Sequence, residues 1–417
     1  MGENNDLFLY VKDLNLKKQD FSVFYLGRSV IFLKNLMYIC ITQKLHLVPQ
    51  TSYLKMLYLK YFFLSFFPFF LASKTTKKLI PEHISSFLVT EKANELFEKM
   101  NDNERIGQML VVATGKLGKP KKDVLEIINK YHIGGILLLN GSKKEFQGYV
   151  KEFDKITQNK NGIPILYSAD AEPSLINFKI KGLPYIKPTS TIKDSADCYN
   201  IGEKISKELL EIGIRHNYAP VCDMSTKNIA IGNRSFGSDE KRVMKMSLAF
   251  INASHNNNVI ATAKHFPGHG YVKGDTHEQL VFIDGELREL PVYKHLIENF
   301  TLSIMVGHIA IKNNEKYNTN GFPATCSRVI VTDLLRKEMN FNGLIVTDAM
   351  NMGAVKKLKD APLLAAKAGN DMILMVEDEG KFVADVLAEM SVNAEFKAQI
   401  YESVKRILRY KVALGII

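Results

Sequence analysis

The sequence predicts an α/β protein folded as a single (β/α)₈ barrel of the TIM type. From about residue 91 onward, eight apolar, strand-like runs alternate with amphipathic stretches of helical period. No G-x-G-x-x-G follows the first run, which disfavours the alternative of a doubly wound open sheet. Of the 417 residues, 46% are hydrophobic and 24% are charged, so the chain can fill a large core.

The expected strands are short runs rich in branched apolar residues. They are Met109–Ala113, Gly135–Leu139, Pro164–Ser168, Tyr218–Cys222, Val259–Ala263, Ser303–Gly307, Gly343–Thr347 and Met372–Val376. The expected helices are Asp123–Tyr131, Lys143–Gln158, Ala196–Ile212, Lys241–Ser254, Leu290–Asn299, Arg328–Met339, Ala361–Ala368 and a closing run, Phe396–Ala413. Because the sequence ends after this last helix, we expect no additional C-terminal sandwich domain.

Residues 1–75 differ from the rest of the chain. The run Met56–Ser73 is strongly apolar but short and interrupted, so it is not expected to span a membrane stably. It has a basic residue near its start and small residues at its end, as a secretory signal does. We therefore expect an upstream extension plus a signal-like segment in 1–75, with Met1 or Met56 as the true start, and the barrel domain in 76–417. Export to the periplasm or the outside follows; a membrane anchor, or a cytoplasmic location, is the alternative.

The formal charge of +11 invites a nucleic-acid partner, but no helix-turn-helix, zinc-finger or RNA-binding signature accompanies it. The basic residues are scattered among acidic ones, so we expect a solvated surface and no nucleic acid. The four cysteines are far apart and fit neither a zinc pattern nor a disulfide framework: Cys40, Cys198, Cys222 and Cys326. We expect a monomer.

The densest chemistry lies in residues 261–277. The string ATAKHFPGHG runs from Ala261 to Gly270, and Gly274-Asp275-Thr276-His277 follows it. Proline and glycines stop regular structure there, so a lysine, three histidines and an aspartate are expected on a loop after a strand. Asp275 and His277 lie two residues apart, so the carboxylate can orient the imidazole and stabilise its charge. Such a pair can donate and accept a proton near neutral pH.

A metal site is the second interpretation of this stretch, since imidazole and carboxylate groups are common ligands. The possible ligands are His265, His269, Asp275 and His277. Proline and glycine separate His265 from His269, so one helical face does not present them together. We therefore expect no metal.

Further polar residues follow the other apolar runs, where a barrel carries its chemistry. They are Asp170 and Glu172 after the third run, Asp223 and Arg234 after the fourth, His308 after the sixth and Asp348 after the seventh. A carboxylate in such a place can simply cap the next helix. In a barrel, however, Asp348 shares a rim with Asp275 and His277.

The string KHFPGHG followed by D-x-H resembles the signature of the β-N-acetylglucosaminidase branch of glycoside hydrolase family 3. This resemblance implies that His277 is the general acid/base and Asp275 its partner. The string V-T-D-A-M-N-M-G-A is similar to the nucleophile motif of the family, which implies that Asp348 is the nucleophile. The resemblance covers these positions in order, from about residue 91 to the end.

The resemblance also implies a substrate-binding set made of Asp170, Arg234, Lys264 and His265. One position departs from the pattern. The family commonly has D-x-E-G-G and then an arginine eight residues after the aspartate, whereas this chain has D-A-E-P-S and then Phe178. A charged contact to the sugar is lost unless Lys179 reaches into the site.

The expected activity is that of a retaining exo-β-N-acetylglucosaminidase acting on peptidoglycan fragments or chitooligosaccharides, with no cofactor. A histidine base is uncharged and repels an anionic acceptor less than a carboxylate would, so a phosphorylase is the first alternative. A non-catalytic sugar-binding barrel is the second. The presence of both Asp348 and the Asp275–His277 pair argues against it, because a binder needs neither.

Overall fold

The structure, a computed structural model, describes residues 81–159, 162–224 and 228–417. All of them belong to one compact unit, residues 76–417. The extension and signal-like segment predicted for 1–75 lie outside the described residues. Within the described ranges, no helix combines the length and the apolar character that a membrane span requires.

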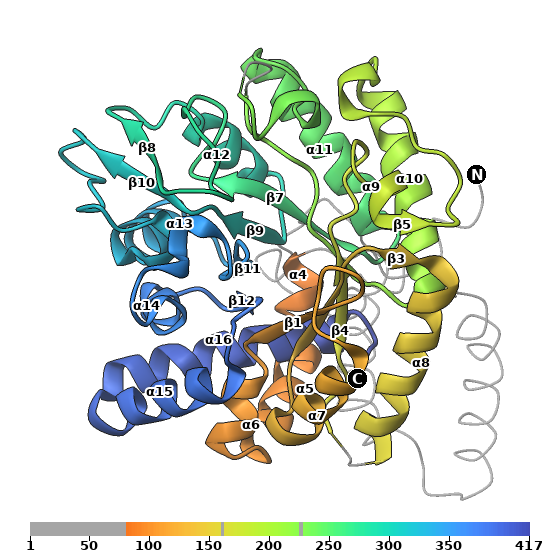
Figure 1. The fold of residues 1–417 in the computed structure, drawn as a ribbon, viewed down its shortest axis with the longest axis vertical. Coiled ribbons are helices and arrows are strands. Elements are labelled where there is room, and N and C mark those ends of the chain that lie inside the picture. Colours follow the sequence, from red (N-terminus) through yellow and green to blue (C-terminus); the bar gives the residue numbers. More distant parts are fainter. Residues whose placement is uncertain (1–80, 160–161, 225–227) are drawn as a thin grey trace, which may run out of the picture. The chain divides into compact units, whose positions relative to one another are not determined.

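Eight parallel strands form the central sheet in the order in which they occur along the chain, as a (β/α)₈ barrel requires (Figure 1). They are β1 (Leu110–Thr114), β2 (Gly135–Leu138), β4 (Leu166–Ala169), β6 (His216–Asn217), β7 (Ile260–Phe266), β9 (Ser303–Val306), β11 (Leu344–Thr347) and β12 (Ile373–Leu374). β1 pairs with β12, and an isolated parallel bridge between Val346 and Met372 joins β12 back to β11. The predicted barrel is confirmed.

Helices surround the strands. The connecting helices are α7 (Lys121–Tyr131), α8 (Lys143–Asn159), α10 (Ser195–Ile212), α11 (Glu240–Asn256), α12 (Leu290–Glu298), the π-helical segment η5 (Val329–Glu338) and α14 (Ala361–Ala368). Before them lie α4 (Pro81–Ile84), α5 (Phe87–Glu98) and α6 (Asp102–Gly107), and after them α15 (Glu379–Val392) and α16 (Ala394–Ala413). Side chains cap several of these helices: Asp194 and Asp239 accept the backbone N–H groups of Asp197 and Arg242 at the starts of α10 and α11.

Short strands and single-turn helices lie in the connections that follow the carboxyl ends of the barrel strands. β8 (Val281–Asp284) pairs in parallel with β10 (Ile309–Lys312), and β3 (Gly141–Ser142) pairs with β5 (Ile180–Lys181). Two single-turn helices, α9 (Ile176–Lys179) and α13 (Gly353–Lys356), follow β4 and β11. Except for β3, these elements lie in connections that carry a polar residue noted in the sequence: Asp170 before α9 and β5, Asp275 and His277 before β8, His308 before β10 and Asp348 before α13.

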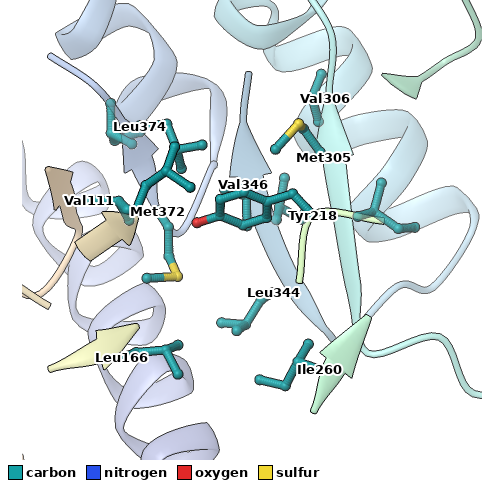
Figure 2. Packing of buried hydrophobic residues seen from close by; sticks show 14 of the residues in the cluster. Val111, Leu166, Tyr218, Ile260, Met305, Val306, Leu344, Val346, Met372 and Leu374 are labelled. Atoms are coloured by element: carbon teal, nitrogen blue, oxygen red, sulfur yellow. The ribbon is translucent and has the colours of Figure 1, made fainter. Parts of the chain in front are cut away.

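Packed side chains fill the barrel interior, so it is a core and not a channel. Figure 2 shows Tyr218 and Met372 reaching toward the centre from opposite sides, with Leu166, Ile260 and Leu344 around them. All five are buried to 1% exposure or less. At about 25 cal/mol per Å² of buried apolar surface, such a core supplies the main favourable term in folding. It also gives the polar rim above it a rigid base.

The structure corrects three details of the prediction. The strand predicted at Tyr218–Cys222 is observed earlier, as β6, because Pro220 has no N–H to donate to a ladder. Lys264 and His265, predicted on a loop, lie within β7, where Lys264 donates its N–H to the Pro220 carbonyl oxygen and accepts the Cys222 N–H. The helices α4, α5, α6 and α15 were not among the predicted helices.

Candidate active site

The predicted nucleophile, Asp348, directly follows β11. Its backbone N–H donates to the carbonyl oxygen of Val306 on β9 (2.9 Å), and its Oδ1 accepts the N–H of Ala349 (2.8 Å). Burial would raise the pKa of Asp348, but the nearby imidazole groups of His265 and His308, together with the hydrogen bond from the Ala349 N–H, hold it below its ordinary value. The carboxylate is therefore ionised at neutral pH, as a nucleophile must be.

His308 fixes the peptide next to Asp348. Its Nε2 donates to the carbonyl oxygen of Ala349 (2.9 Å), and its Nδ1 lies 2.8 Å from the hydroxyl of Thr325. A carbonyl only accepts, so Nε2 carries the hydrogen and Nδ1 accepts from the hydroxyl. Burial lowers the pKa of His308, which keeps the ring neutral and this arrangement intact.

A buried ion-pair cluster joins three of the predicted substrate-binding residues. Lys264 Nζ lies 2.5 Å from Asp170 Oδ1 and 2.6 Å from Glu172 Oε1. Arg234 binds the Glu172 carboxylate through two nitrogens, at 2.8 and 2.7 Å. Lys179 Nζ donates to the remaining oxygen of Asp170. Two carboxylates and three cations therefore meet above β4 and β7.

Charge complementarity decides the protonation states in this cluster. Burial alone would raise the pKa of Asp170, but Lys179, Lys264 and Arg234 hold it well below its usual value. Burial would likewise lower the pKa of Lys264, whereas the two carboxylates raise it. Asp170 and Lys264 are therefore both charged, and the cluster presents several strong donors and acceptors to a ligand rich in hydroxyl groups.

His265 is held by Asp223, which follows β6. The His265 Nδ1 donates to Asp223 Oδ2 (2.7 Å), while Oδ1 accepts the backbone N–H groups of His265 (3.2 Å) and His269 (2.7 Å). The Nε2 atom of His265 is left for a ligand. Burial would raise the pKa of Asp223, and the hydrogen bonds and the imidazoles lower it.

The predicted acid/base pair lies on the connection between β7 and β8. His277 Nδ1 donates to Asp275 Oδ1 (2.7 Å), which also accepts the His277 N–H (2.9 Å). The His277 side chain is 64% exposed, so its Nε2 can exchange a proton with a bound molecule. Burial would raise the pKa of Asp275, but the hydrogen bonds from His277 lower it below its ordinary value. An ionised Asp275 stabilises a charged imidazole.

His269 has a different surrounding from the other histidines of the motif. It is buried, its Nε2 lies 3.4 Å from the Thr276 hydroxyl, and Asn228 donates to its carbonyl oxygen (2.9 Å). Among residues 81–159, 162–224 and 228–417, no group of three or more His, Cys, Asp or Glu side chains is arranged to hold a metal ion. The buried His269 side chain is thus part of the interior packing of the connection between β7 and β8.

From the sequence, Glu172, Asp223 and His308 were noted at the ends of strands but given no role in the site, and Glu289 was not noted at all. The first three had a detectable signal, since each follows an apolar run at the same rim. Glu289 had none: it lies before α12, and its carboxylate accepts the backbone N–H groups of Met224 (2.5 Å) and Gly270 (2.9 Å). Burial, together with the Asp223 charge, raises the pKa of Glu289 to about 8. Glu289 thereby links the connection after β6 to the connection after β7.

This parallel eight-stranded barrel carries an ionised aspartate, an Asp–His pair and a buried cluster of charged side chains at its carboxyl rim, which are groups that a glycoside hydrolase can use. Residues 102–410 match the family model described as "Glycosyl hydrolase family 3 N terminal domain". The chain belongs to glycosyl hydrolase family 3.

Three curated relatives are named as beta-hexosaminidases. The chain is 34% identical to a beta-hexosaminidase of Hydrogenovibrio crunogenus over 188 residues, 43% of this chain and 51% of that protein. It is 26% identical to beta-hexosaminidase A of Pseudoalteromonas piscicida over 386 residues, 79% and 64% of the two chains. It therefore spans about half to two thirds of the length of these two relatives. A beta-hexosaminidase of Haemophilus influenzae is 24% identical, over 66% of this chain and 80% of that protein.

Solved structures agree on the fold. A family 3 beta-N-acetylglucosaminidase from Paenibacillus aligns with a TM-score of 0.70 and 25% identity, over 76% of this chain and 63% of that one. A beta-N-acetylhexosaminidase from Beutenbergia cavernae aligns with a TM-score of 0.68 and 26% identity, over 76% and 99%. A beta-glucoside phosphorylase with a TM-score of 0.72 is 22% identical, over 81% of this chain and 63% of that one, and shows the fold alone.

Proposed function

We propose that this chain is a retaining exo-β-N-acetylglucosaminidase that removes terminal β-linked N-acetylglucosamine. The observation that carries the proposal is the placement of Asp348, with its lowered pKa, on the same rim as the Asp275–His277 pair and the Lys264 cluster. Relatives named beta-hexosaminidase support the substrate. Asp348 is the nucleophile, His277 the acid/base, and Asp170, Arg234, Lys264 and His265 hold the terminal sugar.

In the first displacement, a carboxylate oxygen of Asp348 attacks the anomeric carbon and the glycosidic bond breaks. His277 gives the proton of its Nε2 to the leaving oxygen, since its Nδ1 is engaged by Asp275. Asp275 favours the charged imidazolium before this transfer and orients the ring. The products are the freed aglycone and a glycosyl ester on Asp348.

In the second displacement, the now neutral His277 accepts a proton from water, and the oxygen of that water attacks the anomeric carbon. The ester bond to Asp348 breaks, and N-acetylglucosamine leaves with the β configuration it had in the substrate. Asp348 is again a carboxylate and His277 again protonated. The sugar-binding cluster stays ionised throughout, because its charges compensate one another.

Hydrolysis of 4-nitrophenyl β-N-acetylglucosaminide, followed by proton NMR, tests the proposal. We expect free N-acetylglucosamine that appears first as the β anomer, at a rate that phosphate does not change. Faster turnover in phosphate, with N-acetylglucosamine 1-phosphate as product, would instead establish a phosphorylase. Binding of N-acetylglucosamine without any turnover would establish a sugar-binding barrel.

For the natural substrate we propose peptidoglycan fragments in which N-acetylglucosamine is linked to N-acetylmuramic acid, with chitooligosaccharides as the comparison. The apolar segment Met56–Ser73 supports export, which would bring the enzyme to the cell wall. Relative kcat/KM on a disaccharide of each kind tests the substrate. Sequencing of the mature N-terminus tests export: a start upstream of Lys60 would contradict it.

A further inference from the structure

The acid/base loop contacts the connection that carries the nucleophile. The backbone N–H of Gly353 donates to the carbonyl oxygen of His277 (3.0 Å), and the N–H of Ala354 donates to that of Thr276 (3.2 Å). Gly353 and Ala354 follow Asp348 on the short connection after β11. Two segments far apart in the sequence, one for each catalytic group, are thus joined by main-chain hydrogen bonds.

Gly353 lets the connection after β11 lie closer to the backbone of the His277 loop than any residue with a side chain would allow. A Cβ atom at this position would lie 2.4 Å from the carbonyl oxygen of Glu278 and 2.6 Å from that of His277. Both atoms belong to the backbone of the loop, so a rotamer change cannot relieve the clash. The φ angle of Gly353 is not in the positive region, and a residue with a side chain could adopt its backbone conformation. The glycine is therefore required for contact with the loop, not for the local turn.

These two hydrogen bonds link the backbone at His277 to the connection that carries Asp348. The hydrogen bond of the His277 ring to Asp275 lies within the loop and does not fix the ring relative to Asp348. Asn228 and Glu289 hold the first part of the loop, through the carbonyl oxygen of Val272 (2.7 Å) and the N–H of Gly270 (2.9 Å). The part that contains His277 is joined to the connection after β11 by Gly353 and Ala354, and four residues further on the chain enters β8, which pairs with β10.

We propose that the turn Met352–Ala354 is the docking point of the acid/base loop, and that Gly353 is a positioning residue for His277. The proposal rests on the proposed function, in which His277 protonates the leaving group. It predicts that damage at residue 353 weakens proton donation and leaves the attack by Asp348 intact.

The test compares Gly353→Ala with the wild-type enzyme on two substrates. kcat/KM reports the first displacement, and it should fall about 10- to 100-fold on N,N′-diacetylchitobiose, whose leaving group needs a proton. On 4-nitrophenyl β-N-acetylglucosaminide, whose leaving group needs little help, it should fall less than about threefold. Gly148→Ala is the matched control, since this exposed glycine of α8 has open space around its Cβ position.

A double variant separates positioning from general damage. In the His277→Ala background, Gly353→Ala should cause no further loss on diacetylchitobiose, because the group it positions is already gone. Equal losses on both substrates, or losses that add in the double variant, would overturn the proposal. If Gly353→Ala does not fold, Ala354→Pro replaces it, since it removes one docking N–H in a first helical turn that tolerates proline.

Hydrogen exchange distinguishes a failure of this proposal from a failure of the proposed function. The amides of Gly353 and Ala354 should be protected in the full-length wild-type protein, and the Ala354 amide should lose protection in Gly353→Ala. Fast exchange in the wild type would overturn the docking even if the enzyme is active. A wild type that cleaves neither substrate would refute the function, and protected amides would then still establish the docking of the loop.

Discussion

Lys179 donates to one carboxylate oxygen of Asp170, and Lys264 donates to the other. Lys179 closes α9, next to Phe178, whose side chain is 74% exposed. The position where a family arginine was expected therefore points to solvent, and the adjacent residue supplies the charge. Lys179, one residue after Phe178, thus supplies the positive charge next to Asp170.

Removal of this cation should weaken sugar binding. A charge-assisted hydrogen bond contributes about 1.5 to 3 kcal/mol, so Lys179→Met should lower kcat/KM by about 10- to 100-fold. Lys179→Arg should retain most activity, because it keeps the charge at this place. Phe178→Ala is the control and should change kcat/KM less than about threefold. Steady-state kinetics on 4-nitrophenyl β-N-acetylglucosaminide checks all three, and an unaffected Lys179→Met enzyme would show that the contact does not serve the substrate.

Asp348→Asn should abolish the first displacement, because a neutral amide is a poor nucleophile. We expect a fall in kcat of about 10⁴-fold or more. The same change at Asp333, an exposed residue paired with Lys337, is the control and should leave kcat unchanged. Thermal unfolding of both variants verifies that they fold. Wild-type turnover by Asp348→Asn would remove the nucleophile from this position.

His277→Ala should divide substrates by their leaving groups. On N,N′-diacetylchitobiose, kcat/KM should fall about 10²- to 10⁴-fold, the usual contribution of a general acid. On 4-nitrophenyl β-N-acetylglucosaminide the fall should be much smaller, because nitrophenolate leaves without a proton. His295→Ala, on the outer helix α12, is the control. Similar losses on the two substrates would exclude His277 as the acid.

The barrel was predictable because its signal is local and repeated. The run Leu344–Thr347, for example, is short and apolar, is followed directly by Asp348, and is confirmed as a strand. Helix α15 could also have been found: Asp378 caps it, and Phe382, Val383, Val386 and Met390 follow at helical spacing. β6 was misplaced because apolar character extends beyond its ladder, where Pro220 lacks the donor that a strand needs.

The site was predictable only as far as its residues follow strand ends. The contact of Asp275 with His277 is local, so a spacing of two residues suffices to infer it. Glu289 could not be found in this way, because its partners Met224 and Gly270 lie far from it in the sequence. The hydrogen bonds from Gly353 and Ala354 to the loop of His277 likewise join residues that are far apart in the sequence. The sequence thus points to the candidate reactive groups, and the structure adds the residues that hold them.

A buried lysine at the opposite end of the barrel makes stability depend on pH. Lys411 of α16 is fully buried, and its Nζ donates to Gln108 Oε1 (2.7 Å) and to the carbonyl oxygen of Pro164 (2.8 Å). Both acceptors are neutral, and burial lowers the pKa of Lys411 from 10.5 to about 7. Between these two values the unfolded chain binds more protons than the folded one, so this residue makes the free energy of unfolding rise with pH.

Lys411→Met should remove this dependence. The cost of burying the charge has an upper bound of roughly 5 kcal/mol near pH 7, and it vanishes as the pH approaches 10.5. Below pH 7 the variant should therefore have a larger free energy of unfolding than the wild type. The gain equals the cost of burying the charge minus the cost of leaving Gln108 and the Pro164 carbonyl without their hydrogen bonds. Above pH 7 this gain should shrink steadily. Denaturant unfolding between pH 6 and about 10 measures the difference. Lys397→Met, on the exposed face of the same helix, should show no such slope between pH 7 and 9. A constant difference between Lys411→Met and the wild type across this range would mean that Lys411 is charged in the folded protein at all these pH values.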